Sequence, residues 1–195
     1  MGMLKKIAKI IRVITIPPVL VIVLLSSLYI TQEDFYANTG EFLLSVVFLM
    51  VIPILAYPIS YLIPSIRAKG RSEQRKLAFI CAIVGYFFAF TYSIVVPVSP
   101  ELRFLFITYF LSILMLTLFN NVISLHASGH ACSITGPLVL MTYFIGWKWL
   151  LPCLLVFILI IWSSLVLKRH TAKELFFGSL CAIIAFLFNL MIGLL

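Results

Sequence analysis

Seven long runs of apolar residues constrain this chain more than any other feature of its sequence. Each run holds between 16 and 23 residues, and together they cover 142 of the 195 residues. A helix needs about 20 apolar residues to cross the hydrocarbon core of a membrane. We therefore predict an all-α fold, a polytopic membrane bundle of six or seven transmembrane helices in a single domain over residues 1–195. The runs are Val13–Thr31, Phe42–Pro64, Leu77–Pro97, Arg103–Leu125, Ala131–Gly146, Trp149–Leu167 and Leu175–Leu195.

The overall composition excludes several classes of protein. Apolar residues make up 64% of the chain, charged residues only 10%, and the mean hydropathy is +1.21, whereas a soluble domain carries about 25% charged residues. A soluble enzyme, a secreted disulfide scaffold, a disordered protein and a nucleic-acid-binding module are therefore excluded. The four cysteines are widely spaced within apolar runs, so we expect buried free thiols.

The basic residues are distributed unevenly among the loops. If consecutive runs alternate in direction, 12 of the 14 Lys and Arg residues fall on one face, and only Arg103 and Lys148 on the other. Cytoplasmic loops are enriched in Lys and Arg, so the sequence predicts a cytoplasmic N-terminus. A bacterial or archaeal cytoplasmic membrane is the expected location. The run 131–146 is the shortest of the seven. If it does not span the membrane, the segments before and after it no longer fall on the faces predicted here.

Three short polar segments fall on this same predicted cytoplasmic face. Two of them hold the three histidines of the chain, which are His126, His130 and His170. The third is the basic segment 67–76. Because helical hairpins separate the three segments, we expect them to meet at one membrane surface.

The residue types in the two histidine segments suit phosphate chemistry. His170 and Glu174 stand four residues apart, so on a helix the carboxylate can hold one imidazole nitrogen and leave the other free as a base, nucleophile or ligand. Ser128 and Gly129 precede His130 and suit a helix start, where free backbone N–H groups favour an anion. Arg and Lys side chains add charge-assisted hydrogen bonds to phosphate oxygens. Together these groups describe a phosphoryl-transfer site that needs no metal and no cofactor.

The histidine segments resemble two motifs of the type 2 phosphatidic acid phosphatase superfamily, whose pattern reads KxxxxxxRP, PSGH and SRxxxxxHxxxD. Residues 127–130 resemble the second motif, with alanine in place of its proline. Residues 163–174 resemble the third motif, with its histidine and acid in place and Ser164 where an arginine is expected. The order of the motifs and the 40 residues between His130 and His170 also fit.

The first motif of that superfamily is represented only in part. Arg75 stands for its arginine and is followed by Lys76 instead of proline. The position of its lysine is taken by Ala68, which has a basic residue on either side. The resemblance therefore covers residues 67–174.

The resemblance implies a membrane-embedded phosphatase with three catalytic residues. His170 would attack phosphorus to give a phosphohistidine, Glu174 would orient it, and His130 would protonate the departing lipid alkoxide. The substrate would be a lipid phosphate or diphosphate of the class of phosphatidic acid, phosphatidylglycerophosphate or polyprenyl diphosphate. Membrane lipids are then the expected partners.

The resemblance also implies a set of phosphate-binding groups. Arg75 would bind phosphate oxygens, helped by Ser128 and the Gly129 amide. The candidates to replace the missing arginine of the third motif are Arg169 and Lys69. Loss of one preorganised donor can cost about 100-fold in rate, so this replacement matters for turnover.

Two other functions stay open on the sequence. A catalytically degenerate protein that binds lipid phosphate or assists assembly is favoured by the missing arginine. A metal-dependent membrane enzyme or small transporter could use His126, His130, His170 and Glu174 as ligands for Zn²⁺ or iron. The adjoining cations favour phosphate over a metal ion.

Overall fold

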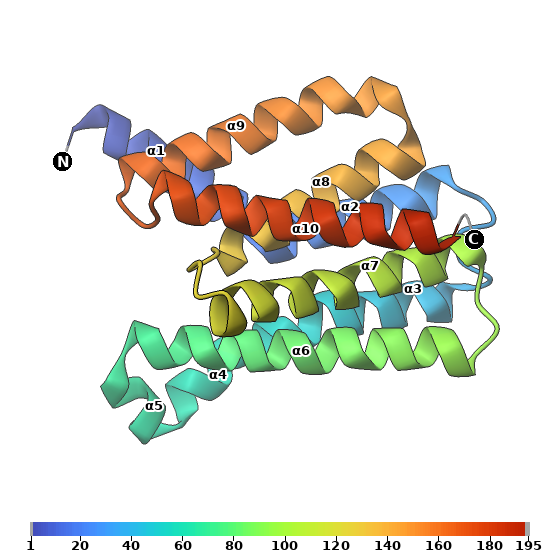
Figure 1. Cartoon of the computed structure of the whole chain (residues 1–195), viewed down its shortest axis with the longest axis horizontal. Helices are drawn as coiled ribbons and strands as arrows, with labels where there is room; N and C mark the ends of the chain where they lie inside the picture. Colours follow the sequence, from blue (N-terminus) through green and yellow to red (C-terminus); the bar gives the residue numbers. More distant parts are fainter. Residues whose placement is uncertain (1, 194–195) are drawn as a thin grey trace.

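The computed structural model describes residues 2–193, apart from the side chain of Arg71. Every regular element in that part of the chain is helical (Figure 1), which confirms the all-α fold. The last two residues of the predicted run 175–195 lie outside the described residues. In chain order the elements are α1 (Met3–Ile14), α2 (Pro17–Thr31), α3 (Thr39–Val46), η1 (Val47–Val51), α4 (Ile52–Leu62), α5 (Pro64–Lys69), α6 (Arg71–Val95), α7 (Pro100–Thr117), η2 (Leu118–Val122), α8 (Gly129–Ile145), η3 (Trp147–Trp149), α9 (Leu150–Val166) and α10 (Ala172–Gly193).

Between residues 2 and 193, five helices are long and apolar enough to cross a membrane. The bent pair α1 and α2 gives a sixth if it is counted as one span, which matches the lower of the two predicted numbers. Helix α8 is apolar but shorter, with 17 residues. The chain is therefore a polytopic α-helical membrane protein. The five long helices are Thr39–Leu62, Ser72–Val95, Pro100–Val122, Trp147–Val166 and Ala172–Gly193.

The first predicted run, 13–31, does not form one straight helix. Helix α1 ends at Ile14, and α2 begins at Pro17 with its axis turned by 48°. Proline suits the first position of a helix because its fixed φ is preorganised and its missing N–H would have had no partner there. The chain therefore starts a new helix at Pro17, and Arg12 belongs to a separate helix that packs along α9.

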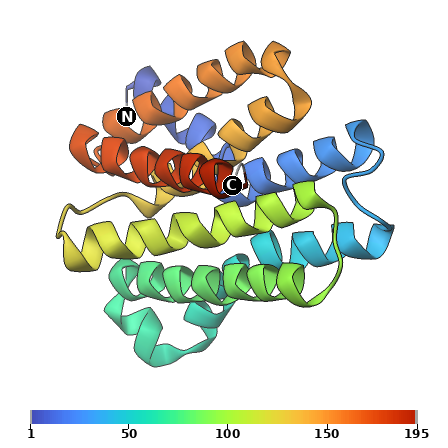
Figure 2. The ribbon, with the colours of Figure 1, turned by 45° about the vertical axis from the view of Figure 1, so that its right-hand side comes forward.

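The remaining helices form one bundle in which neighbours along the chain are often neighbours in space (Figures 1 and 2). Helix α6 packs against α4 and α7, α10 against α7 and α8, and α2 against α8. The buried amide of Asn189 donates to the Phe104 carbonyl and to the Thr108 hydroxyl, both at 2.8 Å, which joins α10 to α7. Interhelical hydrogen bonds of this kind stabilise membrane bundles, where burial of apolar groups drives association less than it does in water.

All the segments that carry the polar clusters lie at one end of this bundle. Figure 1 shows the start of α1, the corner from α5 to α6, the loop from η2 to α8 and the loop from α9 to α10 together at the left-hand end. The connections α2–α3, α6–α7 and α8–α9 lie at the right-hand end. The predicted meeting of segments 67–76, 124–130 and 168–174 at one end of the helices is therefore present.

Candidate functional site

The two histidines of the predicted motifs lie side by side. The imidazole rings of His130 and His170 have their centroids 6.3 Å apart and their planes inclined by only 12°. His130 lies in the first turn of α8, and His170 lies in the loop just before α10. Packing of α8 against α10 thus joins two segments that are 40 residues apart in the chain.

A main-chain hydrogen bond and a close helix contact hold the two histidine segments together. The Ser128 amide donates to the Glu174 carbonyl oxygen at 2.9 Å. On the facing side of α10, Gly178 packs against the same residue. A Cβ added at Gly178 would clash with the Ser128 carbonyl oxygen and would lie 2.9 Å from the Ala131 Cβ. Helix α10 can approach the start of α8 this closely because residue 178 has no side chain.

The start of α8 has the capped form that the sequence predicts. The buried Ser128 hydroxyl accepts a hydrogen bond from the Ala131 amide at 3.3 Å, as an N-cap residue does. The amides of the first helical turn have no partner within the helix and so can bind an anion. Gly129 and His130 are the first two residues of that turn.

The predicted pair of His170 and Glu174 is also in contact. The His170 Nδ1 lies 3.0 Å from the Glu174 Oε2, and the two side chains are 13% and 33% exposed. The Thr171 hydroxyl caps α10 by accepting from the Glu174 amide at 3.2 Å, so His170 itself stands before the helix. The carboxylate turns back over the helix start and fixes one nitrogen of the imidazole.

Strained backbone is concentrated in the two histidine loops. Ser124, His126 and Lys168 have φ values of 59°, 52° and 50°, and they are the only non-glycine residues with positive φ between residues 2 and 193. This conformation is rare for residues with a side chain and persists where tertiary contacts impose it. His126 is exposed in the loop before α8, so His126 and His130 do not stand on one helix face.

Two of the predicted phosphate-binding cations lie away from the histidine pair. Arg75 is exposed near the start of α6, and Lys69 is exposed at the end of α5. Helix α7 separates α6 from α10 (Figures 1 and 2), and neither cation forms a hydrogen bond or ion pair with a histidine within the described part of the chain. Arg169 adjoins His170 in the chain, but its side chain is exposed.

A different cation, one of the 12 basic residues on the predicted cytoplasmic face, lies near the histidine loops. Arg12 of α1 is half-buried, and its Nη1 donates to the Ser164 hydroxyl at 3.3 Å. The Ser164 carbonyl oxygen in turn accepts from the amide of Arg169, the residue before His170, at 3.0 Å. One sequence feature points to Arg12. Its spacing from Lys5 and Lys9 places the three residues on one side of α1, but many surface helices show the same pattern.

The Nε2 nitrogen of His130 lacks a hydrogen-bond partner among the described residues. This nitrogen is shielded from solvent, and no atom of residues 2–193 donates to it or accepts from it. Buried polar atoms are nearly always hydrogen-bonded, so such an atom marks a place for a ligand or water. No group of three or more His, Cys, Asp or Glu side chains in that range is arranged to hold a metal ion.

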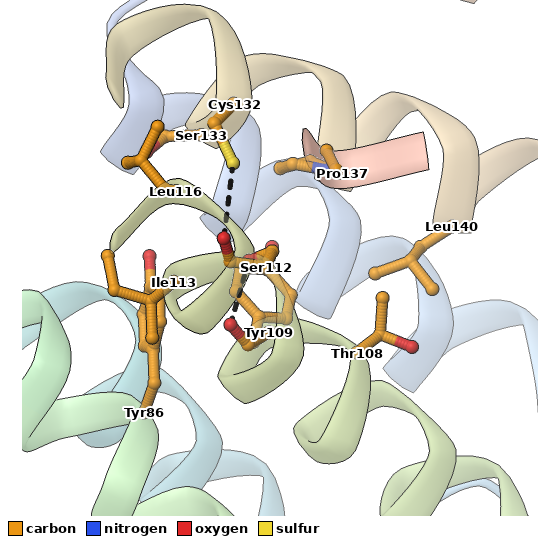
Figure 3. Close-up of a pocket in the computed structure, with 12 residues that line it drawn as sticks. Tyr86, Thr108, Tyr109, Ser112, Ile113, Leu116, Cys132, Ser133, Pro137 and Leu140 are labelled. Carbon is orange, nitrogen blue, oxygen red and sulfur yellow. Dashed lines mark hydrogen bonds between the residues drawn. The ribbon is translucent and has the colours of Figure 1, made fainter. Parts of the chain in front are cut away.

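A small cavity lies deeper in the bundle and is distinct from the histidine pair (Figure 3). Its volume is about 20 Å³, room for one water molecule. Tyr109, whose buried hydroxyl lacks a protein partner in the described chain, lines it. So does Cys132, whose thiol lies 3.8 Å from the Ser112 carbonyl oxygen. A lipid headgroup does not fit there, so the cavity suits a structural water.

Comparison of the chain with protein-family models, with curated protein sequences and with solved structures finds no match. The resemblance to the type 2 phosphatidic acid phosphatase superfamily therefore stays a prediction. It rests on the motif-like residues within 67–174 of the sequence.

Proposed function

We propose that this protein is a membrane-embedded phosphatase that hydrolyses lipid phosphates or diphosphates through a phosphohistidine. The observation that carries the proposal is the nearly parallel pair of His130 and His170, 6.3 Å apart, with Glu174 bound to the second ring. A nucleophile held by an orienting acid, beside a second proton-transfer group, is the arrangement that covalent phosphoryl transfer uses.

In the proposed first step His170 is the nucleophile. Its Nδ1–H donates to Glu174, so the Nε2 lone pair is free to attack phosphorus. The phosphorus–oxygen bond to the lipid breaks as the nitrogen–phosphorus bond forms. Glu174 stabilises the positive charge that develops on the imidazole, and the partly buried position strengthens that interaction.

His130 handles the proton in both proposed steps. It protonates the departing lipid oxygen, then takes a proton from the water that attacks the phosphohistidine and releases inorganic phosphate. An imidazole nitrogen attacks or donates in the plane of its ring, so the phosphoryl group would bind at the nitrogen-bearing edges of the two rings. Ring centroids 6.3 Å apart are close enough for one phosphate group to contact nitrogens of both rings, and this supports the proposal.

The proposed substrates follow from where the pair lies. The loops that carry the histidines lie at one end of a bundle of apolar helices, and lipid headgroups are expected at the ends of membrane-spanning helices. The excess of Lys and Arg at this end favours the cytoplasmic leaflet. Phosphatidic acid, phosphatidylglycerophosphate and polyprenyl diphosphates carry the phosphate groups that such a site would take.

One observation favours a second candidate function. Arg75, which represents the arginine of the first motif, and Lys69, a candidate to replace the missing arginine of the third, lie away from the histidines. Ser164 stands where the third motif has that arginine. A protein that binds a lipid phosphate without hydrolysing it would tolerate these changes. Turnover that depends on His170 excludes this second candidate.

The test is phosphate release by the detergent-purified protein from a panel of the three lipid classes, with EDTA present. We expect release by the wild type, and its loss by at least about 100-fold in His170→Asn, because the nucleophile is gone. His126→Asn is the matched control, since His126 is exposed in the neighbouring loop and Asn also accepts its positive φ. We expect this control to keep its activity.

Three results would contradict the proposal. Release that persists in His170→Asn would show that another group attacks phosphorus. Release that EDTA abolishes would point to a bound metal. Absence of release from every lipid, by a protein that still binds them, would favour the non-hydrolysing candidate.

A further inference from the structure

Arg12 occupies an unusual position for a cation in an apolar bundle. Its side chain is half-buried between α1 and α9, with Nη1 hydrogen-bonded to Ser164, which is fully buried. Ala8, one turn earlier on α1, is fully buried as well. The two residues therefore share the face of α1 that packs on α9, and the guanidinium points into the protein side of the helix.

No carboxylate of residues 2–193 forms an ion pair with the guanidinium. The two ion pairs found within residues 2–193 join Lys76 to Glu73 and His170 to Glu174, and neither includes Arg12. A partly desolvated cation without a counter-ion is costly, so an anion bound beside Arg12 would lower that cost.

We propose that Arg12 is a phosphate-binding residue of the histidine site. Held by Ser164, whose carbonyl oxygen accepts from the Arg169 amide next to His170, its guanidinium binds the phosphate oxygens of the substrate. Guanidinium groups bind phosphate through paired, charge-assisted hydrogen bonds. This inference rests on the proposed function, because it assigns the cation that neutralises the phosphoryl group there.

The helix that carries Arg12 also has the character of a membrane-surface helix. Met3, Leu4, Ile10 and Ile14 of α1 expose 58% or more of their side chains, while helix periodicity puts Lys5 and Lys9 on the opposite side. An amphipathic helix of this kind lies in the membrane interface with its apolar side among the acyl chains. Arg12 thus reaches the site from an element at headgroup level, which suits a phosphate attached to a lipid.

The test compares Arg12→Gln and Arg12→Lys with Lys9→Gln, a control on the same helix whose side chain is exposed. The substrate is dioctanoyl phosphatidic acid. We expect kcat/KM to fall by about 100-fold in Arg12→Gln and by less in Arg12→Lys, which keeps the charge but loses the paired geometry. Lys9→Gln is expected to stay within about twofold of wild type, since a surface charge contributes little.

A binding measurement separates a phosphate contact from a packing role. We expect calorimetric titration with inorganic phosphate, and separately with dioctanoyl phosphatidic acid, to show affinity at least about tenfold lower in Arg12→Gln for both, because both present the same oxygens. Weaker binding of the lipid alone would overturn the assignment of Arg12 to phosphate. Thermal unfolding of each variant in detergent verifies that it is folded.

A relocated guanidinium gives a third readout. The double variant of Arg12→Ser with Ser164→Arg moves the group to the other end of the hydrogen bond and is expected to recover part of the lost activity. A folded double variant with no recovery over Arg12→Ser counts against the proposal.

The outcomes distinguish this proposal from the proposed function. If His170→Asn is inactive but Arg12→Gln keeps wild-type kcat/KM and phosphate affinity, Arg12 is not a phosphate ligand and the phosphatase stands. If the wild type hydrolyses no lipid phosphate, the phosphatase proposal fails. The titrations then still decide the role of Arg12, since equal phosphate affinity of wild type and Arg12→Gln would overturn it.

Discussion

At the scale of single residues, the proposed chemistry depends on one oriented imidazole. Glu174 holds His170 Nδ1 at 3.0 Å, which selects the tautomer with Nε2 free. The opposite ring, His130, keeps a nitrogen without a protein partner in the described chain. The two histidines therefore have different environments, and we assign them different roles.

Glu174→Gln tests the orienting role. The amide can present its NH₂ group to Nδ1 and favour the wrong tautomer, so we expect kcat to fall by about 100-fold while the protein stays folded. The measurement is steady-state hydrolysis of the best lipid of the panel, with thermal unfolding as the check on folding. Unchanged kcat would remove Glu174 from the proposed mechanism.

His130→Gln tests whether His130 is the proton donor to the leaving group while His170 is the nucleophile. Without the proton donor, the lipid alkoxide is a poor leaving group, so we expect hydrolysis of a lipid phosphate to fall by about 100-fold. A substrate with an acidic leaving group, such as a p-nitrophenyl phosphate ester, needs no proton and should be hydrolysed with a much smaller loss. Equal losses with both substrates would contradict the role of His130 as the acid.

At the scale of helices, the site exists because α10 crosses the start of α8 without a side chain between them. The Ser128 amide bonds to the Glu174 carbonyl there, and Gly178 leaves room for the Ser128 carbonyl oxygen. The histidine spacing is therefore set by the helix crossing as well as by the loops. A side chain that pushes α10 away from the start of α8 should therefore change the distance between His130 and His170.

Gly178→Ala is the corresponding prediction. The new Cβ would meet the Ser128 carbonyl, so we expect about 1 to 3 kcal/mol of destabilisation, as for overpacking in general, and a loss of activity. Gly136→Ala in α8 is the matched control, because a Cβ there meets nothing within 4 Å. The control should be neutral or slightly stabilising. Thermal unfolding and hydrolysis are measured for both variants. Equal stability and equal activity of the two would show that α8 and α10 can accommodate a Cβ at their crossing.

At the scale of the whole molecule, the connections and charges of the bundle bear on which leaflet the site serves. The histidine loops share one end with the basic segment 67–76 and with the start of α1. The opposite end holds the acidic loop around Glu33. The positive-inside rule then predicts that the histidines face the cytoplasm.

Single exposed cysteines test this orientation in whole cells. In a Cys81→Ser background, whose other three cysteines are buried, we expect a membrane-impermeant maleimide to label Glu33→Cys directly and Lys173→Cys only after permeabilisation. Both positions are exposed and lie at opposite ends of the bundle. The reverse pattern would place the site at the outer leaflet.

Much of this architecture follows from the sequence by itself. The length of the apolar runs determines the all-α membrane bundle, because a lipid solvent leaves the backbone only its own hydrogen bonds. The spacing of His170 and Glu174 determines their contact, since residues four apart meet near a helix start. The cap formed by Ser128 is equally local. These features depend on short stretches of chain and on the solvent around them.

Tertiary structure decided which distant groups meet. Nothing local predicts that Arg12, 152 residues before Ser164, bonds to it, because that contact depends on how α1 turns at Pro17 and packs along α9. The same holds for Arg75 and Lys69, whose motif-like positions place them beyond α7, away from the histidines. The sequence by itself determines local contacts and the choice of membrane over water. Helix packing alone decides which cation stands at the histidines, because a phosphate site needs groups near one another in space and not along the chain.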